Sequence, residues 1–263
     1  MNRFFLLSFI SFVLVSCLQE TNTSSSVDTN ANDSSLTEKE IFGNKDNCQE
    51  EILFQQAYEN ALKFSENQLN KDEFNHNSQE YLYRCPLQMK VHVEYGNLFS
   101  TNQKHLIIKR KLEWETRVNI YSVKNKKLSD IFEKKYVGTT SYLSDSVMDV
   151  NGDNIKDFVV LSYPSSGCCL ANINEINLYN HLSDNFQESI TVLNPTYSPK
   201  EKIIRGLEYG HPGETGIYKF RWINNYKLDT LEYIYPFYRK GGFYIKTKKP
   251  DYRPQEKNGT VLT

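Results

Sequence analysis

The segment from Asp149 to Asp157 carries residue types and a spacing that could hold a metal ion. It reads DVNGDNIKD, so that three carboxylates and an asparagine recur at short intervals. Calcium takes about six to eight oxygen ligands, and a loop supplies them from alternate residues because alternate side chains turn to one side of a coiled backbone. With Asp149 at the first position, Asn151, Asp153 and Asp157 fall at the third, fifth and ninth, and Ile155 offers its backbone carbonyl at the seventh. We therefore predict that these residues bind a structural Ca²⁺.

This segment is not an EF-hand, and a turn without metal is the alternative. The twelfth position is Val160 where an EF-hand has a bidentate glutamate, and a β-like run follows where an EF-hand has a helix. Asn154 stands where such loops usually have glycine, and asparagine tolerates positive φ. Asp, Asn and Gly also favour turns through their own hydrogen bonds. Because three acids this close repel one another at pH 7 unless a cation neutralises them, we favour calcium, with a weak Kd of about 10⁻⁴ to 10⁻³ M.

The sequence patterns that could indicate catalysis are weaker than the pattern that indicates metal binding. The five histidines are His76, His92, His105, His181 and His211. They do not show the sequence spacing of metal ligands. The sequence HPGE places an acid–base pair, His211 and Glu214, on one turn, and an envelope hydrolase that uses this pair is the alternative function. Pro-Gly also predicts a plain type II turn, and no nucleophile lies nearby in the sequence. We therefore expect a protein that is not an enzyme and name no catalytic residue.

The elements that must position these residues are mainly strands. Apolar residues at a 3.6-residue period, with acids in the first turn, predict one helix over about 47–69. After it, short β-like runs alternate with Asn, Asp, Gly, Ser and Lys, and no second helical pattern intervenes. These runs cover residues 89–95, 105–112, 116–123, 157–163, 173–179, 216–223, 231–235 and 242–245. We predict a mainly β fold with propeller-like or stacked antiparallel sheets.

The N-terminus reads as a targeting segment that ends in a modified cysteine. Arg3 precedes an apolar run that is too short to span a bilayer, and the run ends in LVSC at Cys17. This ending resembles a bacterial lipobox, in which the cysteine thiol accepts a diacylglyceryl group. The organisation we expect is a signal peptide (1–16), a lipidated cysteine with a disordered polar tether (17–45), a helix plus β domain (46–247) and a flexible tail (248–263).

The composition of the chain bears on its class of partner, and the residue after Cys17 bears on the membrane to which it is anchored. The chain has 263 residues, 39% hydrophobic and 24% charged, with net charge −1, which gives no reason to expect a nucleic-acid partner. Leu18, not aspartate, follows Cys17. The lipobox resemblance therefore implies the outer membrane of a diderm bacterium, with the direction the domain faces left open.

The remaining cysteines predict disulfides, since four remain after Cys17 and an exported protein meets an oxidising compartment. A bond between the neighbours Cys168 and Cys169 is disfavoured, because adjacent Cα atoms lie about 3.8 Å apart and disulfides need about 4.4 Å or more. Two arrangements stay open. Either Cys48 and Cys85 each reach the Cys168–Cys169 pair, or Cys48 bonds Cys85.

The acidic segment, running directly into an apolar strand, resembles the calcium loops of FG-GAP-type repeat proteins. It is more similar to a set of bacterial lipoproteins with one such loop on a propeller-like β domain, and NIYS at 119–122, NPTYSPK at 194–200 and HPGE at 211–214 extend the likeness. Some members of that set inhibit peptidoglycan-cleaving enzymes as immunity proteins. The resemblance implies a lipid-anchored, calcium-stabilised binding protein of the cell envelope with a protein or glycan partner. A purely structural assembly component is a further alternative.

Overall fold

The computed structural model of the chain describes residues 49–82, 87–164, 171–208, 215–237, 242–250 and 259–262. Every described residue belongs to one compact unit of the chain, Glu38–Thr263. The predicted signal peptide, the tether, all the cysteines and the His211–Glu214 pair lie outside the described residues.

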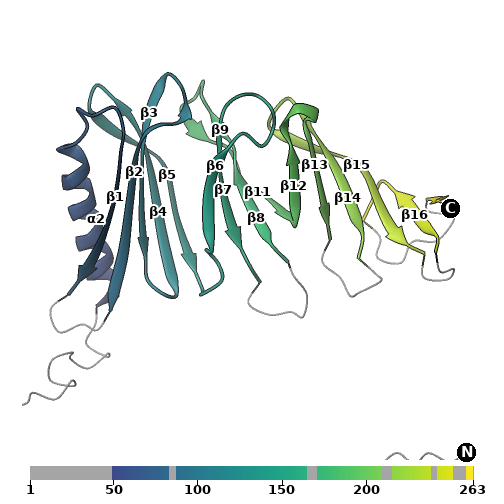
Figure 1. Cartoon of the computed structure of the whole chain (residues 1–263), viewed down its shortest axis with the longest axis horizontal. Coiled ribbons are helices and arrows are strands. Elements are labelled where there is room, and N and C mark those ends of the chain that lie inside the picture. The colour runs from purple at the N-terminus through teal and green to yellow at the C-terminus, as the bar shows by residue number, and fades with distance from the viewer. Residues whose placement is uncertain are drawn as a thin grey trace, which may run out of the picture. The chain divides into compact units, whose positions relative to one another are not determined.

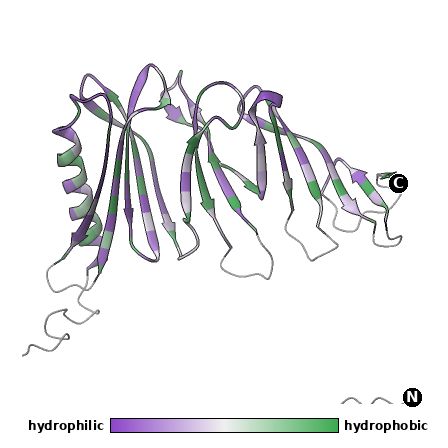
Figure 2. Cartoon of the chain, viewed as in Figure 1, coloured by the Kyte–Doolittle hydropathy of each residue, from purple (hydrophilic) through white to green (hydrophobic). Residues whose placement is uncertain are grey.

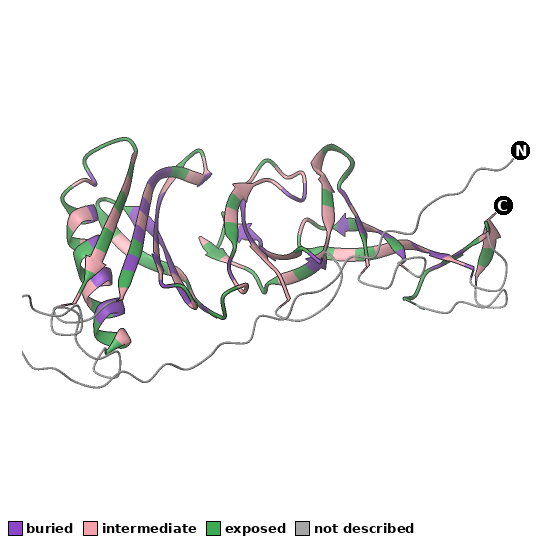
Figure 3. Cartoon of the chain, turned by 60° about the horizontal axis from the view of Figure 1, so that its bottom comes forward, coloured by how far each residue is buried: buried purple, intermediate pink, exposed green. Residues whose placement is uncertain are grey.

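Helix α2 (Glu50–Glu66) confirms the single helix expected from the sequence. Glu50 and Glu51 occupy its first turn, where acids interact favourably with the helix dipole. One face is buried, and its residues are Leu53, Phe54, Ala57, Ala61 and Ser65 (Figure 3). This apolar stripe packs the helix against the first sheet.

The first sheet is fully antiparallel, in the order β1-β2-β3-β4-β5. Its strands are β1 (Phe74–Tyr81), β2 (Gln88–Ser100), β3 (Gln103–Lys111), β4 (Glu115–Lys124) and β5 (Lys127–Val137). A tight turn joins β4 to β5, with φ of 51° at Asn125 and 61° at Lys126, the left-handed pair that tight hairpins favour. Figure 1 shows α2 lying against one face of this sheet.

The second sheet has the order β11-β8-β7-β6, so β6 forms one of its edges. Its strands are β6 (Ser144–Met148), β7 (Asp157–Ser162), β8 (Ile173–Asn177) and β11 (Ile190–Leu193). A small ribbon of β9 (Tyr179–Asn180) and β10 (Asn185–Phe186) accompanies it. Phe158 and Val160 on β7 share a buried cluster with Ile107 and Ile120, which face away from α2 on the first sheet. The second sheet therefore covers part of the first sheet's other face.

The third sheet has the order β12-β13-β14-β15-β16-β17. Its strands are β12 (Pro195–Ser198), β13 (Ile203–Leu207), β14 (Ile217–Ile223), β15 (Lys227–Pro236), β16 (Tyr244–Thr247) and β17 (Thr260–Leu262), with the short helix η2 (Pro199–Glu201) after β12. Val159 and Ile176 of the second sheet pack into one cluster with Ile204, Tyr218 and Tyr235 of the third.

The described domain is thus mainly β and built in layers: α2, the first sheet, the second sheet and the third sheet. Each pair of neighbouring layers encloses one of three apolar clusters. The prediction of a mainly β fold with stacked antiparallel sheets is confirmed. The described strands form open sheets, without a closed barrel or propeller among them.

Candidate functional site

The acidic segment forms the connection between β6 and β7, and its backbone is folded around its own side chains. Asp149 Oδ1 accepts the N–H groups of Asn151 (3.2 Å) and Gly152 (2.6 Å), and Oδ2 accepts that of Asn154 (3.0 Å). Asn154 has φ of 66°, which confirms that this position needs the left-handed conformation. Gly152 has φ of 76°, and a Cβ there would lie 2.0 Å from the carbonyl oxygen of Pro199, so glycine is also required by close packing on η2.

Asp157 closes this segment and is the most buried of its acids, with 1% of its surface exposed. Its Oδ2 accepts the N–H of Val150 (3.2 Å) and its Oδ1 accepts that of Tyr179 (3.1 Å). The pKa of Asp157 is raised to about 8, chiefly by burial and also by the nearby charges of Asp153 and Asp149, against the opposing effect of the two backbone donors. The fold therefore brings the three predicted acidic ligands into electrostatic contact.

The side chains of Asn151 and Asp153, which are also predicted ligands, already form hydrogen bonds. Asn151 Oδ1 accepts the N–H of Asp153 (3.1 Å), and Asn151 Nδ2 donates to Asp153 Oδ2 (3.1 Å) and to the carbonyl of Asn225 (2.8 Å). Such side chain to backbone bonds are also what a metal-free turn would make. The described residues hold no group of three or more His, Cys, Asp or Glu side chains arranged to bind a metal ion.

These residues nevertheless have the oxygen donors that calcium prefers. Each carboxylate oxygen that accepts one N–H retains a lone pair for a cation. A buried carboxyl next to two further acids is also stabilised in its charged form by a nearby cation. Calcium binding at Asp149, Asn151, Asp153, Ile155 and Asp157 stays a prediction.

A buried polar network lies beside this segment without forming an accessible site. His105 Nε2 is 3.1 Å from the Tyr179 hydroxyl, which donates to Asp184 Oδ1 (2.8 Å). Burial lowers the pKa of His105 to about 4, although the charge of Asp184 opposes this. His105 has no exposed surface, and neither of the two pockets described next includes these three residues. Within the described chain this network is therefore a structural element of the core.

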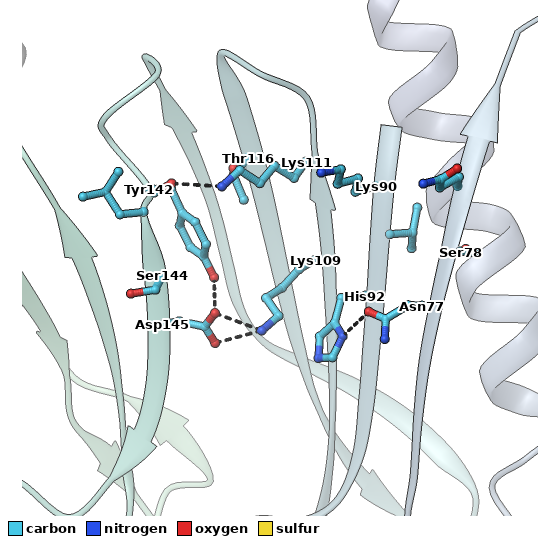
Figure 4. A pocket seen from close by; sticks show the side chains of 13 residues that line it. Asn77, Ser78, Lys90, His92, Lys109, Lys111, Thr116, Tyr142, Ser144 and Asp145 are labelled. Atoms are coloured by element: carbon cyan, nitrogen blue, oxygen red, sulfur yellow. Dashed lines mark hydrogen bonds and ion pairs between the residues drawn. The ribbon is translucent and has the colours of Figure 1, made fainter. Parts of the chain in front are cut away.

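A groove runs between the edge strand β6 and the outward face of β1, β2 and β3. It contains two pockets, of about 610 and 740 Å³, and both are lined by Lys109 and Asp145. Lys109 Nζ is 2.9 Å from each carboxylate oxygen of Asp145, and the Tyr142 hydroxyl donates to Asp145 Oδ1 (2.7 Å). Figure 4 shows Lys109 reaching from β3 to Asp145 on β6, between the two walls.

Most side chains on the floor of the groove are polar, and strand β1 is coloured mostly hydrophilic in Figure 2. The strand register places its side chains in cross-strand rows. Gln79, Lys90, Lys111 and Thr116 form one row, and Asn77, His92 and Lys109 lie in the next. His92 Nδ1 is 2.8 Å from Asn77 Oδ1. At the far end, the Lys156 N–H donates to the carbonyl of Phe99 (3.0 Å) and ties the two walls together.

Sequence reasoning missed the groove. The alternation in MKVHVEY on β2 was a usable signal, because Lys90, His92 and Glu94 had to share the face opposite the apolar residues. Strand β6 carried no such signal, since SDSVM reads as a polar loop. Which residues face β6 depends on the arrangement of the sheets.

Comparisons with known proteins give no family for this chain. No family model, no curated protein and no solved structure matches it. Among the described residues, no helix combines the length and the apolar character needed to cross a membrane.

Proposed function

We propose that this protein is a non-enzymatic binding protein of the cell envelope, anchored by lipid on Cys17 and stabilised by calcium at residues 149–157. The groove between β6 and the first sheet is the observation that carries the binding role. It is lined by lysines, amides and a histidine, and its two pockets follow almost the whole length of β6. A long polar groove between rigid strands suits recognition of a protein or glycan chain.

The concrete form of this function is inhibition of a peptidoglycan-cleaving enzyme, as the resemblance of the acidic segment implies. A panel of lysozyme-type and other peptidoglycan hydrolases, assayed with increasing amounts of the purified protein, tests it. We expect saturable inhibition of at least one hydrolase and none by heat-denatured protein. If no hydrolase in the panel is inhibited, the inhibitor function is wrong.

The anchor is tested separately in cells of a diderm bacterium. We expect labelled palmitate to be incorporated into the full chain and to fractionate with the outer membrane, since acyl chains supply about 0.8 kcal/mol per buried CH₂. Cys17→Ser should abolish labelling. Incorporation of palmitate into the Cys17→Ser variant would contradict the predicted lipid anchor.

Calcium is tested by thermal unfolding. At about 10 mM Ca²⁺ and the weak Kd expected, linkage contributes roughly 1.5 to 2.5 kcal/mol, or a rise in Tm of roughly 5 °C. Asp153→Ala should remove this rise, while Asp229→Ala, an exposed aspartate on β15, should keep it. A Tm of the wild-type protein that is the same in EDTA and in calcium would show that the segment is a metal-free turn.

A further inference from the structure

The edge of β6 that faces the groove carries no strand in the described structure. In the order β11-β8-β7-β6 the sheet ends there, and β6 pairs with β7 alone. Every residue from Ser144 to Val147 lines one of the two pockets. An edge strand presents a row of N–H and C=O groups that can pair with an added chain. Edges are often protected by inward charges, but the carboxylate of Asp145 is already paired with Lys109.

The floor beside this edge has an excess of positive charge. Lys90 and Lys111 are direct cross-strand partners on β2 and β3 and line the same pocket. Neither makes an ion pair with a carboxylate in the described part of the chain. Lys111 Nζ contacts Tyr142 instead, at 3.4 Å from its carbonyl oxygen and 5.8 Å from the centroid of its ring. Like charges directly opposite each other destabilise a sheet. An anionic ligand over this row would relieve that repulsion.

Charge also varies along the groove. The row of Lys90 and Lys111 contains no acid, and in the next row the charge of Lys109 is neutralised by Asp145. Glu94 follows in the third row, on the same face of β2. An extended chain in the groove therefore needs an acidic side chain at the Lys90 end.

We propose that β6 accepts an added strand, and that its occupant is an extended acidic segment of a partner protein. Main-chain groups of the partner pair with the edge of β6, and its acidic side chains lie over Lys90 and Lys111. Neighbouring strands lie about 4.8 Å apart, so the added strand extends the second sheet across the uncovered face of β2 and β1. This inference rests on the proposed binding role and assigns that role to one edge and one class of partner.

The test uses a capped seven-residue peptide in which glutamate alternates with valine. A glutamine analogue removes its charge, a proline analogue removes main-chain donors, and a trimer of galacturonic acid supplies negative charge without a peptide backbone. We expect the glutamate peptide to bind the whole protein in calorimetric titration, and each of the other three probes to bind about tenfold or more weakly. Hydrogen exchange at Ser144–Met148 should slow with the glutamate peptide.

Variants of the protein locate the charge. The double variant Lys90→Gln with Lys111→Gln should bind the glutamate peptide about tenfold or more weakly than wild type. Both side chains lie on the open groove, so this variant should fold, and Lys90→Glu provides a second variant with a stronger effect. The matched control, Lys63→Gln with Lys227→Gln, changes the net charge equally at two exposed lysines outside the groove and should bind like wild type.

Several results would overturn the inference. The first is that the glutamate peptide does not bind at millimolar concentration. The second is that the proline analogue or the sugar acid binds as tightly as the glutamate peptide and exchange at β6 does not slow. The third is that the control variant loses as much affinity for the peptide as the Lys90→Gln with Lys111→Gln variant. The experiments distinguish a failure of the strand-addition inference from a failure of the inhibitor function. If Lys90→Gln with Lys111→Gln inhibits a hydrolase as wild type does, the groove is not the binding surface. If no hydrolase is inhibited but the peptide results hold, only the inhibitor function is wrong.

Discussion

The two halves of one sheet face differ sharply in this protein. On the face of the first sheet that looks away from α2, the half over β3, β4 and β5 is covered by the second sheet, and Ile107 and Ile120 are fully buried there. On the half over β1 and β2 the same cross-strand row continues with Glu94 and Asn75, which line the groove. In this row the change from apolar to polar side chains falls between β3 and β2, whereas in the row of Lys109 it falls between β4 (Val118) and β3.

This difference supports the proposal that the uncovered half meets polar groups of a partner. A strand that waits for an apolar partner would expose large apolar side chains, as protein interfaces do at their centre. Here the uncovered side chains of β1 and β2 are mostly amides, a lysine, a histidine and a glutamate, with Tyr81 (56% exposed) as the large aromatic side chain among them. Stability should therefore depend on the covered half and ligand binding on the uncovered half.

The largest expected effect is loss of packing in the covered half. Phe158 on β7 has no exposed surface and contacts Phe132 edge to face. Phe158→Ala should lower the free energy of unfolding by about 3 to 5 kcal/mol, because it removes buried apolar surface and leaves a cavity. Urea unfolding measures this, with Asn77→Ala in the uncovered half as the control at about 0.5 kcal/mol or less. Equal losses in both variants would contradict the division.

The next effect is a pH dependence that originates at His105 in the covered half. Its folded-state pKa is about 4, because burial disfavours the charged ring. In the unfolded chain its pKa is about 6.5. His105 therefore contributes stability that is fully present above about pH 6.5 and is lost as the pH falls towards 4, by at most about 3 kcal/mol. Asp184, which opposes the shift, and Lys124, which adds to it, are the charged groups nearby.

Urea unfolding of wild type and of His105→Gln between pH 4 and pH 7.5 measures this contribution as the difference between the two slopes. Asp157, whose raised pKa acts with the opposite sign, is common to both proteins. Ile107→Val is the matched control, since it loosens the same cluster by about 0.5 to 1.5 kcal/mol without removing a titrating group. We expect Ile107→Val to lose that amount equally at every pH. A His105→Gln variant with the wild-type slope would show that His105 does not cause the acid sensitivity.

The strands that sequence reasoning identified are those with apolar residues at alternate positions, such as β2, or in a short continuous run, such as β7. Strand β1 was missed because FNHNSQEY is almost wholly polar. Its strand character comes from tertiary contacts: Phe74 stacks on Tyr95 at 5.0 Å, and His76 stacks on Phe64 of α2 at 4.0 Å. Local pattern cannot report contacts between residues so distant in the chain.

The candidate sites divide in the same way. The acidic segment was predictable because its residues are neighbours in the sequence and their spacing carries the chemistry. The groove was not, because Lys109, Lys111 and Asp145 come together only through the number of strands in each sheet and their register. The end of the second sheet at β6 decides which polar side chains stay uncovered.

The smallest effect concerns the ion pair at the boundary between the two halves. The side chains of Lys109 and Asp145 are 16% and 14% exposed, and the Tyr142 hydroxyl completes the contact. Asp145→Asn should cost about 1 to 2 kcal/mol in urea unfolding, since Lys109 loses its partner in a partly buried place. It should also leave Lys109 free, and so strengthen binding of the acidic peptide about threefold or more. An exposed pair gives the control: Glu201→Gln, which breaks the pair with Arg205, should leave both the urea midpoint and peptide binding unchanged. If Asp145→Asn weakens the peptide instead, the carboxylate of Asp145 is itself part of the binding surface, and the added strand must carry a donor opposite it.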